Sequence, residues 1–198
     1  MKKKQQRIII ITGTPGVGKT SVAAVLASKL KATLINLGEL VKKENLVLDV
    51  DKTRGTLIAD LKKVTKYVKK LTASAQGDIV VDGHYAVNVI PKKDVTRVFV
   101  LRRNPEELKK LMENRGWSQT KVQENLACEV LDVCLFDAVK ACGEEKVCEI
   151  DVTGKSVQEV VDEVLSVLKE NRKCWVGVVD WLGHLEREGR VEEFLGEP

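Results

Sequence analysis

The stretch from Gly13 to Thr20 matches the pattern G-x-x-x-x-G-K-[ST], and it follows an apolar run, Ile8 to Ile11. Between a strand and a helix, this pattern forms a phosphate-binding loop. Its glycines let the backbone wrap closely around phosphate oxygens, and consecutive N–H groups at the positive end of the helix supply the donors. We expect Lys19 to reach the β and γ phosphates of a nucleotide and the Thr20 hydroxyl to ligate Mg²⁺. In this context a chance glycine turn is the weaker interpretation.

Beyond the loop, short β-branched runs alternate with helical stretches. The expected strands cover residues 7–12, 33–36, 78–82, 95–101 and 146–151, and the expected helices cover residues 19–30, 38–71 with an interruption around 49–55, 105–115, 118–141, 156–171 and part of 175–195. This alternation predicts an α/β fold with a parallel sheet and a ligand at the carboxyl ends of the strands. Because the 198 residues contain no repeat and no low-complexity linker, we expect one P-loop domain over residues 1–198.

The composition is that of a globular protein, with 43% hydrophobic residues and a net charge of +4. This charge is too small to establish nucleic-acid binding, although lysines crowd residues 2–4 and glutamates make the last stretch acidic. The basic end is either a solvated terminus or a contact with a polyanion. No run is long enough for a signal core or a membrane span, so we expect an intracellular protein.

Five cysteines occupy positions 128, 134, 142, 148 and 174, and no two of them form a C-x-x-C pair. A zinc site is therefore not expected. We interpret the five cysteines as small buried thiols.

An acidic residue stands where a metal partner is needed. Ile79 to Asp82 is an apolar run that ends in a carboxylate, which is the form of a Walker B element. We expect Asp82 to hold the Mg²⁺ shell, together with Thr20 of the loop. His84 follows two residues later. It is either a hydrogen-bonded structural residue or, beside the metal and the γ-phosphate, a group that positions water or relays a proton.

A cation is expected near the transferred phosphoryl group, because arginine suits the charge that develops there. Arg115 lies at the end of an expected helix, just before Gly116, where a mobile lid could hinge. Arg102 and Arg103 follow the fourth expected strand and are either near the same cleft or solvated on the surface.

Three absences narrow the class: there is no N-K-x-D motif of GTPases, no L-S-G-G-Q signature of transporter ATPases, and too little length for a typical AAA module. Four segments, Gly13–Ser21, Asn36–Leu40, Asp82–His84 and Arg115–Trp117, resemble the archaeal and nuclear-type adenylate kinase family, the group of adenylate kinase isoenzyme 6. The run from Lys121 to Leu126 and Glu129 also resemble the family's helix after the lid. The resemblance covers about residues 7–171.

The resemblance implies a nucleoside monophosphate kinase-like P-loop NTPase, with a five-stranded parallel sheet core flanked by helices. A monophosphate-binding insert would cover about residues 36–59 and a short lid about residues 114–124, with residues 172–198 as a C-terminal amphipathic extension. The implied catalytic residues are Lys19, Asp82, His84 and Arg115. The implied ATP-binding residues are Gly16, Gly18, Lys19, Thr20, Ser21, Arg115 and Lys155, and the AMP-binding region includes Asn36, Gly38, Leu40, Lys42 and Arg54.

The chain also departs from the family pattern. Trp117 stands where the family usually has tyrosine, and the AMP region offers Lys42, Lys43 and Arg54 where ordinary adenylate kinases use arginines. Since lysine is a point charge and not a bidentate fork, AMP binding is expected to be weaker or less selective.

Three functions stay open at this stage. The first is a kinase that transfers the γ-phosphoryl group of MgATP to AMP, with accompanying ATPase activity. The second, which the resemblance implies, is an ATP-switched assembly factor that binds a small-subunit ribosomal protein and pre-ribosomal RNA. The third is a small-metabolite kinase of the shikimate or gluconate type. The resemblance further implies a cytoplasmic, archaeal protein that is a monomer, alone or with a ribosomal protein.

Overall fold

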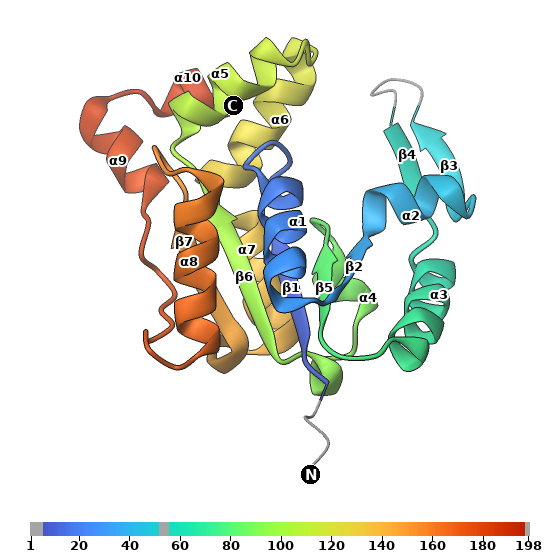
Figure 1. Ribbon diagram of the computed structural model, residues 1–198. Coiled ribbons are helices and arrows are strands. Elements are labelled where there is room, and N and C mark those ends of the chain that lie inside the picture. Colours follow the sequence, from blue (N-terminus) through green and yellow to red (C-terminus); the bar gives the residue numbers. More distant parts are fainter. Residues whose placement is uncertain (1–5, 52–55, 197–198) are drawn as a thin grey trace.

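Five parallel strands form the central sheet of the computed structural model, which describes residues 6–51 and 56–196 (Figure 1). In spatial order they are β2 (Thr33–Asn36), β5 (Ile79–Asp82), β1 (Ile8–Thr12), β6 (Arg97–Arg102) and β7 (Val147–Asp151). Every neighbouring pair is parallel. The expected five-stranded parallel α/β fold is confirmed, and each strand lies within two residues of its predicted range.

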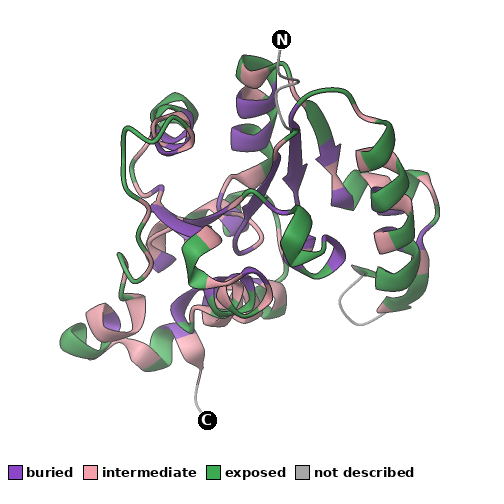
Figure 2. Cartoon of the chain, turned by 90° about the horizontal axis from the view of Figure 1, so that it is seen from below, coloured by how far each residue is buried: buried purple, intermediate pink, exposed green. Residues whose placement is uncertain are grey.

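Helices cover both faces of this sheet. Successive residues of β1 point to opposite faces, so Ile9 and Ile11 join one buried cluster while Ile8 and Ile10 join the other. The helices on the first face are α1 (Lys19–Leu30), α5 (Pro105–Asn114), α6 (Gln119–Val130) and α8 (Val157–Leu168), and those on the second face include α3 (Leu61–Ser74), α4 (Ala86–Val89) and α7 (Val133–Cys142). Figure 2 shows the central strands in the colour of buried residues between these layers, whereas the edge strand β2 is exposed at Thr33 and Leu34. Burial on both faces is why the strands read as continuous apolar runs.

The register of the strands brings their carboxyl ends to one edge. Asp82 at the end of β5 pairs with Asn36 of β2 on one side and with Ile11 of β1 on the other. Because β1 continues directly into the glycine loop, the loop and Asp82 share this edge. It is the edge at which ligands bind in open parallel sheets.

The region predicted as mostly helical contains a hairpin. After α2 (Leu37–Lys43), strands β3 (Val47–Asp51) and β4 (Thr56–Ala59) pair antiparallel before α3 begins. The interruption predicted around 49–55 is therefore a β-hairpin and not a break between helices. The physical reason is the local run of β-branched and aliphatic residues on both sides of the turn, which favours strands. Residues 52–55 themselves lie outside the described part of the chain.

The single helix predicted over residues 118–141 is two helices, α6 and α7. They are separated at Asp132, which adopts a left-handed conformation with φ of 56°. Aspartate tolerates this conformation better than most residues, and its carboxylate accepts a hydrogen bond from the buried Arg102 guanidinium. The break is therefore fixed by a tertiary contact.

The tail forms two short helices instead of the one that was predicted. They are α9 (Trp181–Glu188) and α10 (Val191–Leu195), and Gly189 between them has a φ of 67° that ends α9. Leu185 and Phe194 are buried in the cluster that includes α6. Short 3-10 turns, Lys92–Asp94 and Glu144–Lys146, precede β6 and β7. None of the helices within residues 6–51 and 56–196 is long and apolar enough to cross a membrane.

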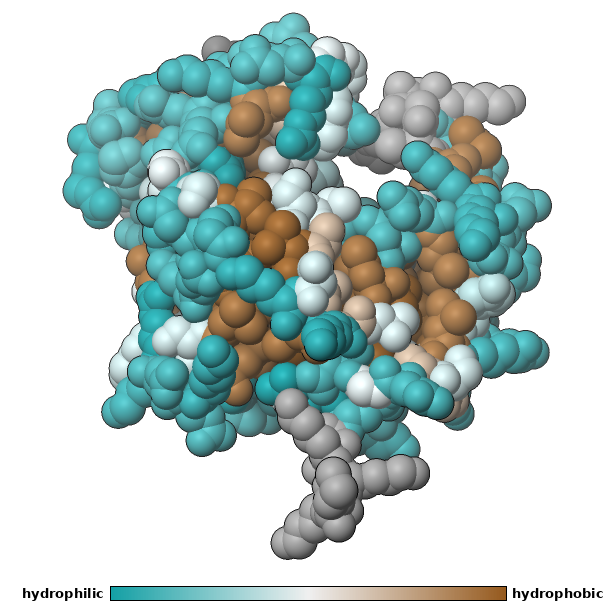
Figure 3. Space-filling view, in the orientation of Figure 1, coloured by the Kyte–Doolittle hydropathy of each residue, from teal (hydrophilic) through white to brown (hydrophobic). Residues whose placement is uncertain are grey.

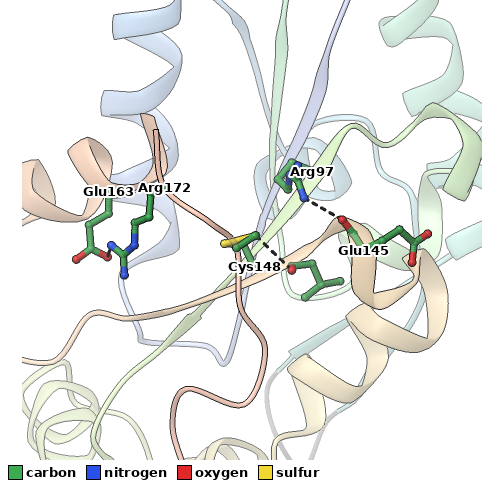
Figure 4. The surroundings of a disulfide bond; sticks show 7 residues. Arg97, Glu145, Cys148, Glu163 and Arg172 are labelled. Atoms are coloured by element: carbon green, nitrogen blue, oxygen red, sulfur yellow. Dashed lines mark hydrogen bonds and ion pairs between the residues drawn. A yellow bond between two sulfur atoms is a disulfide. The ribbon is translucent and has the colours of Figure 1, made fainter. Parts of the chain in front are cut away.

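The interpretation of all five cysteines as thiols is wrong. Cys148 in β7 forms a disulfide with Cys174 in the tail, as Figure 4 shows, while Cys128, Cys134 and Cys142 are free thiols. The partners are 26 residues apart in sequence, and their Cα atoms lie 5.0 Å apart. The sequence carries no signal for this pair, because only the folded tail brings Cys174 beside the edge strand.

Candidate active site

The phosphate loop connects β1 to α1 in the conformation that its glycines allow. Gly13 has a φ of 134°, and a Cβ atom there would lie 2.4 Å from the carbonyl oxygen of Leu101. Gly18 has a φ of 108° and stands at the N-terminus of α1, where no side chain caps the helix. The first N–H groups of α1 are thus left for an anion, as a phosphate site requires.

Lys19 folds back onto this loop. Its Nζ donates to the carbonyl oxygen of Thr14 at 2.9 Å. Desolvation lowers the pKa of Lys19, and the negative charge of Asp82 is the largest of the effects that oppose it. The bond to Thr14 holds the ammonium group of Lys19 at the phosphate loop, where a cation can meet a bound phosphate.

Asp82 lies where the loop, β5 and β2 meet. Its Oδ2 accepts from Thr20 Oγ1 at 2.7 Å and from Asn36 Nδ2 at 2.7 Å. Burial raises the pKa of Asp82, while the hydrogen bond from Thr20 and the charge of Lys19 lower it. The two residues predicted to serve Mg²⁺ are therefore in direct contact.

These two oxygen donors fit a magnesium ion that is shared with phosphates. Mg²⁺ prefers hard oxygen ligands and usually takes only one or two from the protein, the rest being waters and substrate phosphates. Among the described residues, no three His, Cys, Asp or Glu side chains cluster as an all-protein metal cage would need. The donor set of Thr20 and Asp82 therefore suits an ion that arrives with the nucleotide.

His84 lies two residues beyond Asp82 and keeps contact with solvent, while its ring lies close enough to Lys19 for the charge of the lysine to act on it. The hydrogen bond from Thr12 Oγ1 goes to the backbone carbonyl of His84 and not to the ring, and the ring packs edge-on to Tyr85 at 4.7 Å between centroids. Desolvation and then the positive charge of Lys19 lower the pKa of His84 to about 4. At neutral pH the ring is an uncharged imidazole, which can both donate and accept a hydrogen bond.

The expected lid residue Arg115 ends α5, and Gly116 follows it with a φ of 70°. Arg115 is exposed, and its charge is one of the effects that lower the pKa of Lys19. Trp117 packs half-buried against the core, with Lys121 Nζ 4.4 Å from its ring centroid. The fold thus places an exposed arginine at a glycine turn, within electrostatic reach of Lys19.

The two arginines after β6 have different surroundings. Arg103 lies beside the loop, where its Nε donates to the carbonyl oxygen of Val17 at 3.3 Å. Arg102 is only 1% exposed and hydrogen-bonds buried carboxylates, including Glu129 and Glu149. Of the two alternatives left by the sequence, proximity to the cleft holds for Arg103, and a solvated surface position is wrong for Arg102.

The remaining ATP-site candidates are less closely tied to the loop. Gly16 packs against Leu108 and Met112, and Ser21 is exposed in the first turn of α1. Lys155 follows β7 and is paired with Glu163 Oε1 of α8 at 2.7 Å. Glu163 also pairs with Arg172 of the tail (Figure 4).

The candidates for the second nucleotide site lie on and after β2. Asn36 caps α2 by accepting from the backbone N–H of Glu39 at 2.9 Å while it also donates to Asp82. Gly38 and Lys42 are exposed on α2, whereas Leu40 is half-buried against the core. Arg54 lies outside the described residues. The structure therefore joins Asn36 to the loop edge and does not bring Leu40 there.

The arm built from α2, β3 and β4 stands apart from the α5–α6 side of the molecule, and the surface is hollowed between them (Figure 3). The loop edge lies at the base of this opening, between the two sides (Figure 1). The phosphate loop therefore lies at the base of a hollow, with the arm on one side of it and α5 and α6 on the other.

Comparison with known proteins agrees with this geometry. Residues 9–132 match a family model described as "AAA domain", so the P-loop core is similar to that class although the chain is short for a typical AAA module. A protein of Methanocaldococcus jannaschii named "Putative adenylate kinase" is 38% identical over 87% of this chain and 92% of its own length. One of the same name from Methanothermobacter thermautotrophicus is 39% identical over 90% and 99%.

The chain belongs to this adenylate kinase-like family. Its fold is that of the P-loop kinases: the solved structure of shikimate kinase from Acinetobacter baumannii superposes with a TM-score of 0.62 over 85% of this chain and 96% of that one. At 14% identity this likeness shows the fold alone.

Sequence reasoning missed the part that Glu129 plays in the site. This residue is 1% exposed and accepts a hydrogen bond from Thr14 Oγ1 of the loop at 2.5 Å. Its position within the helix that resembles the family after the lid was the available signal, but nothing in the sequence connects it to residue 14.

Proposed function

We propose that the protein is an adenylate kinase that transfers the γ-phosphoryl group of MgATP to AMP. The observation that carries this proposal is the hydrogen-bonded set in which Asp82 joins Thr20 of the phosphate loop to Asn36 at the start of the arm. This set connects the expected ATP and AMP sites through one carboxylate. The names of the relatives support the same activity.

Positioning and charge neutralisation are what this chemistry needs from a protein. The loop N–H groups and Lys19 hold the β and γ phosphates, and Arg115 moves in from the lid to share the charge on the transferred group. A phosphate oxygen of AMP forms the new bond to the γ phosphorus as the bond to the ADP oxygen breaks. Bound Mg²⁺ supplies further neutralisation of charge, and Thr20 and Asp82 are the residues that would hold it. Closure of the lid excludes water.

The arm is proposed to bind AMP. Its hairpin exposes several aliphatic side chains, namely Leu48, Val50, Leu57 and Ile58. Such a surface gives a nucleotide apolar contact but little selectivity, and Lys42 offers a point charge where a bidentate arginine would be more selective. We therefore propose AMP as the preferred acceptor with modest discrimination against other monophosphates.

A second candidate function is an ATPase that acts in small-ribosomal-subunit maturation. The observation that favours it is the surface of α3, which exposes lysines along one helix; they are Lys62, Lys66, Lys69 and Lys70. A basic stripe of this kind suits contact with pre-ribosomal RNA, beside a ribosomal protein as partner. In this function water replaces AMP as acceptor, and the neutral ring of His84 positions it. We further propose that the protein works in the cytoplasm as a monomer until it meets such a partner.

An acceptor screen tests the first function. Purified protein with MgATP is supplied in turn with AMP, CMP, UMP, GMP, shikimate and gluconate, and ADP formation is followed in a coupled assay. We expect AMP to give the highest rate and Lys19→Ala to abolish all turnover. If no monophosphate increases ADP formation above the rate with water, the kinase proposal is wrong, and a response to shikimate or gluconate would support the metabolite-kinase alternative.

The His84→Ala variant separates the two functions. We expect it to lose phosphate release in the absence of AMP while it keeps transfer to AMP, because only hydrolysis needs an oriented water. Binding to small ribosomal subunits with ATP, ADP or no nucleotide then tests the second function. Absence of binding in all three states would contradict it.

A further inference from the structure

Thr14 is the second residue of the phosphate loop and is completely buried. Its hydroxyl donates to Glu129 Oε2 at 2.5 Å, and its carbonyl oxygen accepts from Lys19 Nζ at 2.9 Å. The hydroxyl of Thr14 is therefore held by α6, and its carbonyl oxygen in turn holds the ammonium group of the catalytic Lys19.

The carboxylate that holds Thr14 is itself fixed from the other side. Glu129 Oε1 accepts from Arg102 Nε at 2.9 Å and from the backbone N–H of Arg103 at 3.0 Å. Arg102 also donates to the backbone carbonyl of Glu129 at 2.9 Å and to Glu149 Oε1 at 2.6 Å. With both carboxylate oxygens bound and the arginine anchored at several points, Glu129 has little freedom to rotate.

We propose that Glu129 is a positioning residue for MgATP binding. By accepting the hydrogen bond from the Thr14 hydroxyl, Glu129 holds the phosphate loop in its binding conformation before MgATP arrives. The inference rests on the proposed function only in taking MgATP as the ligand. It adds a residue of α6 to a site that the sequence places in the loop, β5 and the lid.

The physical reason lies in the freedom of the loop. Gly13, Gly16 and Gly18 all have positive φ, and glycine loses more conformational freedom on ordering than any other residue. If the nucleotide must itself order the loop, its apparent affinity is the intrinsic affinity multiplied by the fraction of time that the free loop spends in the binding conformation. A buried hydrogen bond to a fixed carboxylate orders the loop before the nucleotide arrives and keeps Lys19 directed toward it.

Three variants test this. Thr14→Val removes the hydroxyl with almost no change in shape, and Glu129→Gln removes the charge. Thr14→Ser is the conservative variant, which keeps a hydroxyl at this position. The matched control is Thr96→Val, which removes a hydroxyl that accepts from the backbone N–H of Ile8 at the opposite end of β1. Affinity for magnesium-bound AMPPNP, a non-hydrolysable ATP analogue, is measured by calorimetry, and the melting temperature of each variant is recorded.

We expect Thr14→Val to weaken AMPPNP binding about ten- to hundredfold, which is the range for a buried hydrogen bond to a charged group. KM for ATP should rise while KM for AMP stays within about twofold, a split that general destabilisation would not produce at temperatures well below the melting transition. Thr14→Ser should bind AMPPNP much more tightly than Thr14→Val and keep most of the wild-type affinity. Thr96→Val should leave the affinity unchanged.

A double-mutant cycle completes the test. If Glu129 acts through Thr14, adding Thr14→Val to Glu129→Gln should weaken binding by no more than about threefold beyond Glu129→Gln alone. The proposal is overturned if Thr14→Val binds AMPPNP like the wild type, or if the two effects multiply in full. Should Glu129→Gln fail to fold, Thr14→Val and Thr14→Ser still decide the matter. A wild-type protein that does not bind AMPPNP would instead refute the proposed function.

Discussion

The disulfide between β7 and the tail should be a major source of stability. The tail residues next to Cys174 also form hydrogen bonds with Glu149 of β7. The backbone N–H of Glu149 donates to the carbonyl oxygen of Trp175 at 2.9 Å, and the backbone N–H of Val178 donates to Glu149 Oε2 at 2.7 Å. Replacing both Cys148 and Cys174 by serine frees this segment in the unfolded chain. For a sequence separation of 26 residues, loop-closure entropy gives a loss of about 3.5 kcal/mol.

Urea unfolding followed by tryptophan fluorescence measures this loss. Wild-type protein treated with a reductant should show the same destabilisation as the double serine variant, because both lack the cross-link. Cys128→Ser is the matched control, since Cys128 is a half-buried free thiol, and it should change the free energy of unfolding by less than about 1 kcal/mol. The reasoning is refuted if reductant leaves the wild-type unfolding curve unchanged, or if peptide mapping under non-reducing conditions finds Cys148 and Cys174 unlinked.

Three further results are expected. Ser156→Ala should destabilise the protein by about 1 kcal/mol in thermal or urea unfolding, because Ser156 and Glu159 form a reciprocal capping box at the start of α8; no change would mean that this cap is dispensable. Cys134 should alkylate about a hundredfold more slowly at pH 8 than an ordinary thiol, because desolvation raises its pKa to about 11 and the thiolate is the reactive form. Its rate by mass spectrometry should still rise between pH 9 and 10, and a plateau near pH 9 would contradict the burial. Asp82→Asn should raise the Mg²⁺ concentration needed for half-maximal activity about ten- to hundredfold, and an unchanged requirement would remove Asp82 from the metal site.

Local patterns were sufficient for the sheet and the loop. Buried parallel strands are continuous apolar runs, so β1 and β5 could be located within one residue, and the glycine loop between β1 and α1 has a fixed spacing. The contact between Thr20 and Asp82 also follows from topology, because parallel strands end at the same edge. Both predictions rest on interactions that are short in sequence or imposed by the sheet.

The features that the sequence did not predict depend on contacts between distant residues. The helix break at Asp132 depends on a hydrogen bond from Arg102, and Arg102 is buried because it also donates to Glu129 and Glu149; none of these contacts can be seen in the local sequence. The Cys148–Cys174 pair needs the tail to fold back along β7. A hairpin in place of a helical interruption was missed because aliphatic residues at short spacing suit either structure. The roles assigned to His84, Arg115 and Lys155 stay predictions.

Transfer of the γ-phosphoryl group to AMP is tested most directly by following a label. Purified protein is incubated with γ-labelled ATP, Mg²⁺ and unlabelled AMP, and the products are separated by chromatography. An adenylate kinase puts the label into newly formed ADP, with two molecules of ADP for each ATP consumed and little free phosphate. Label that appears only as inorganic phosphate, at the same rate with and without AMP, would contradict the assignment and identify the protein as an ATPase.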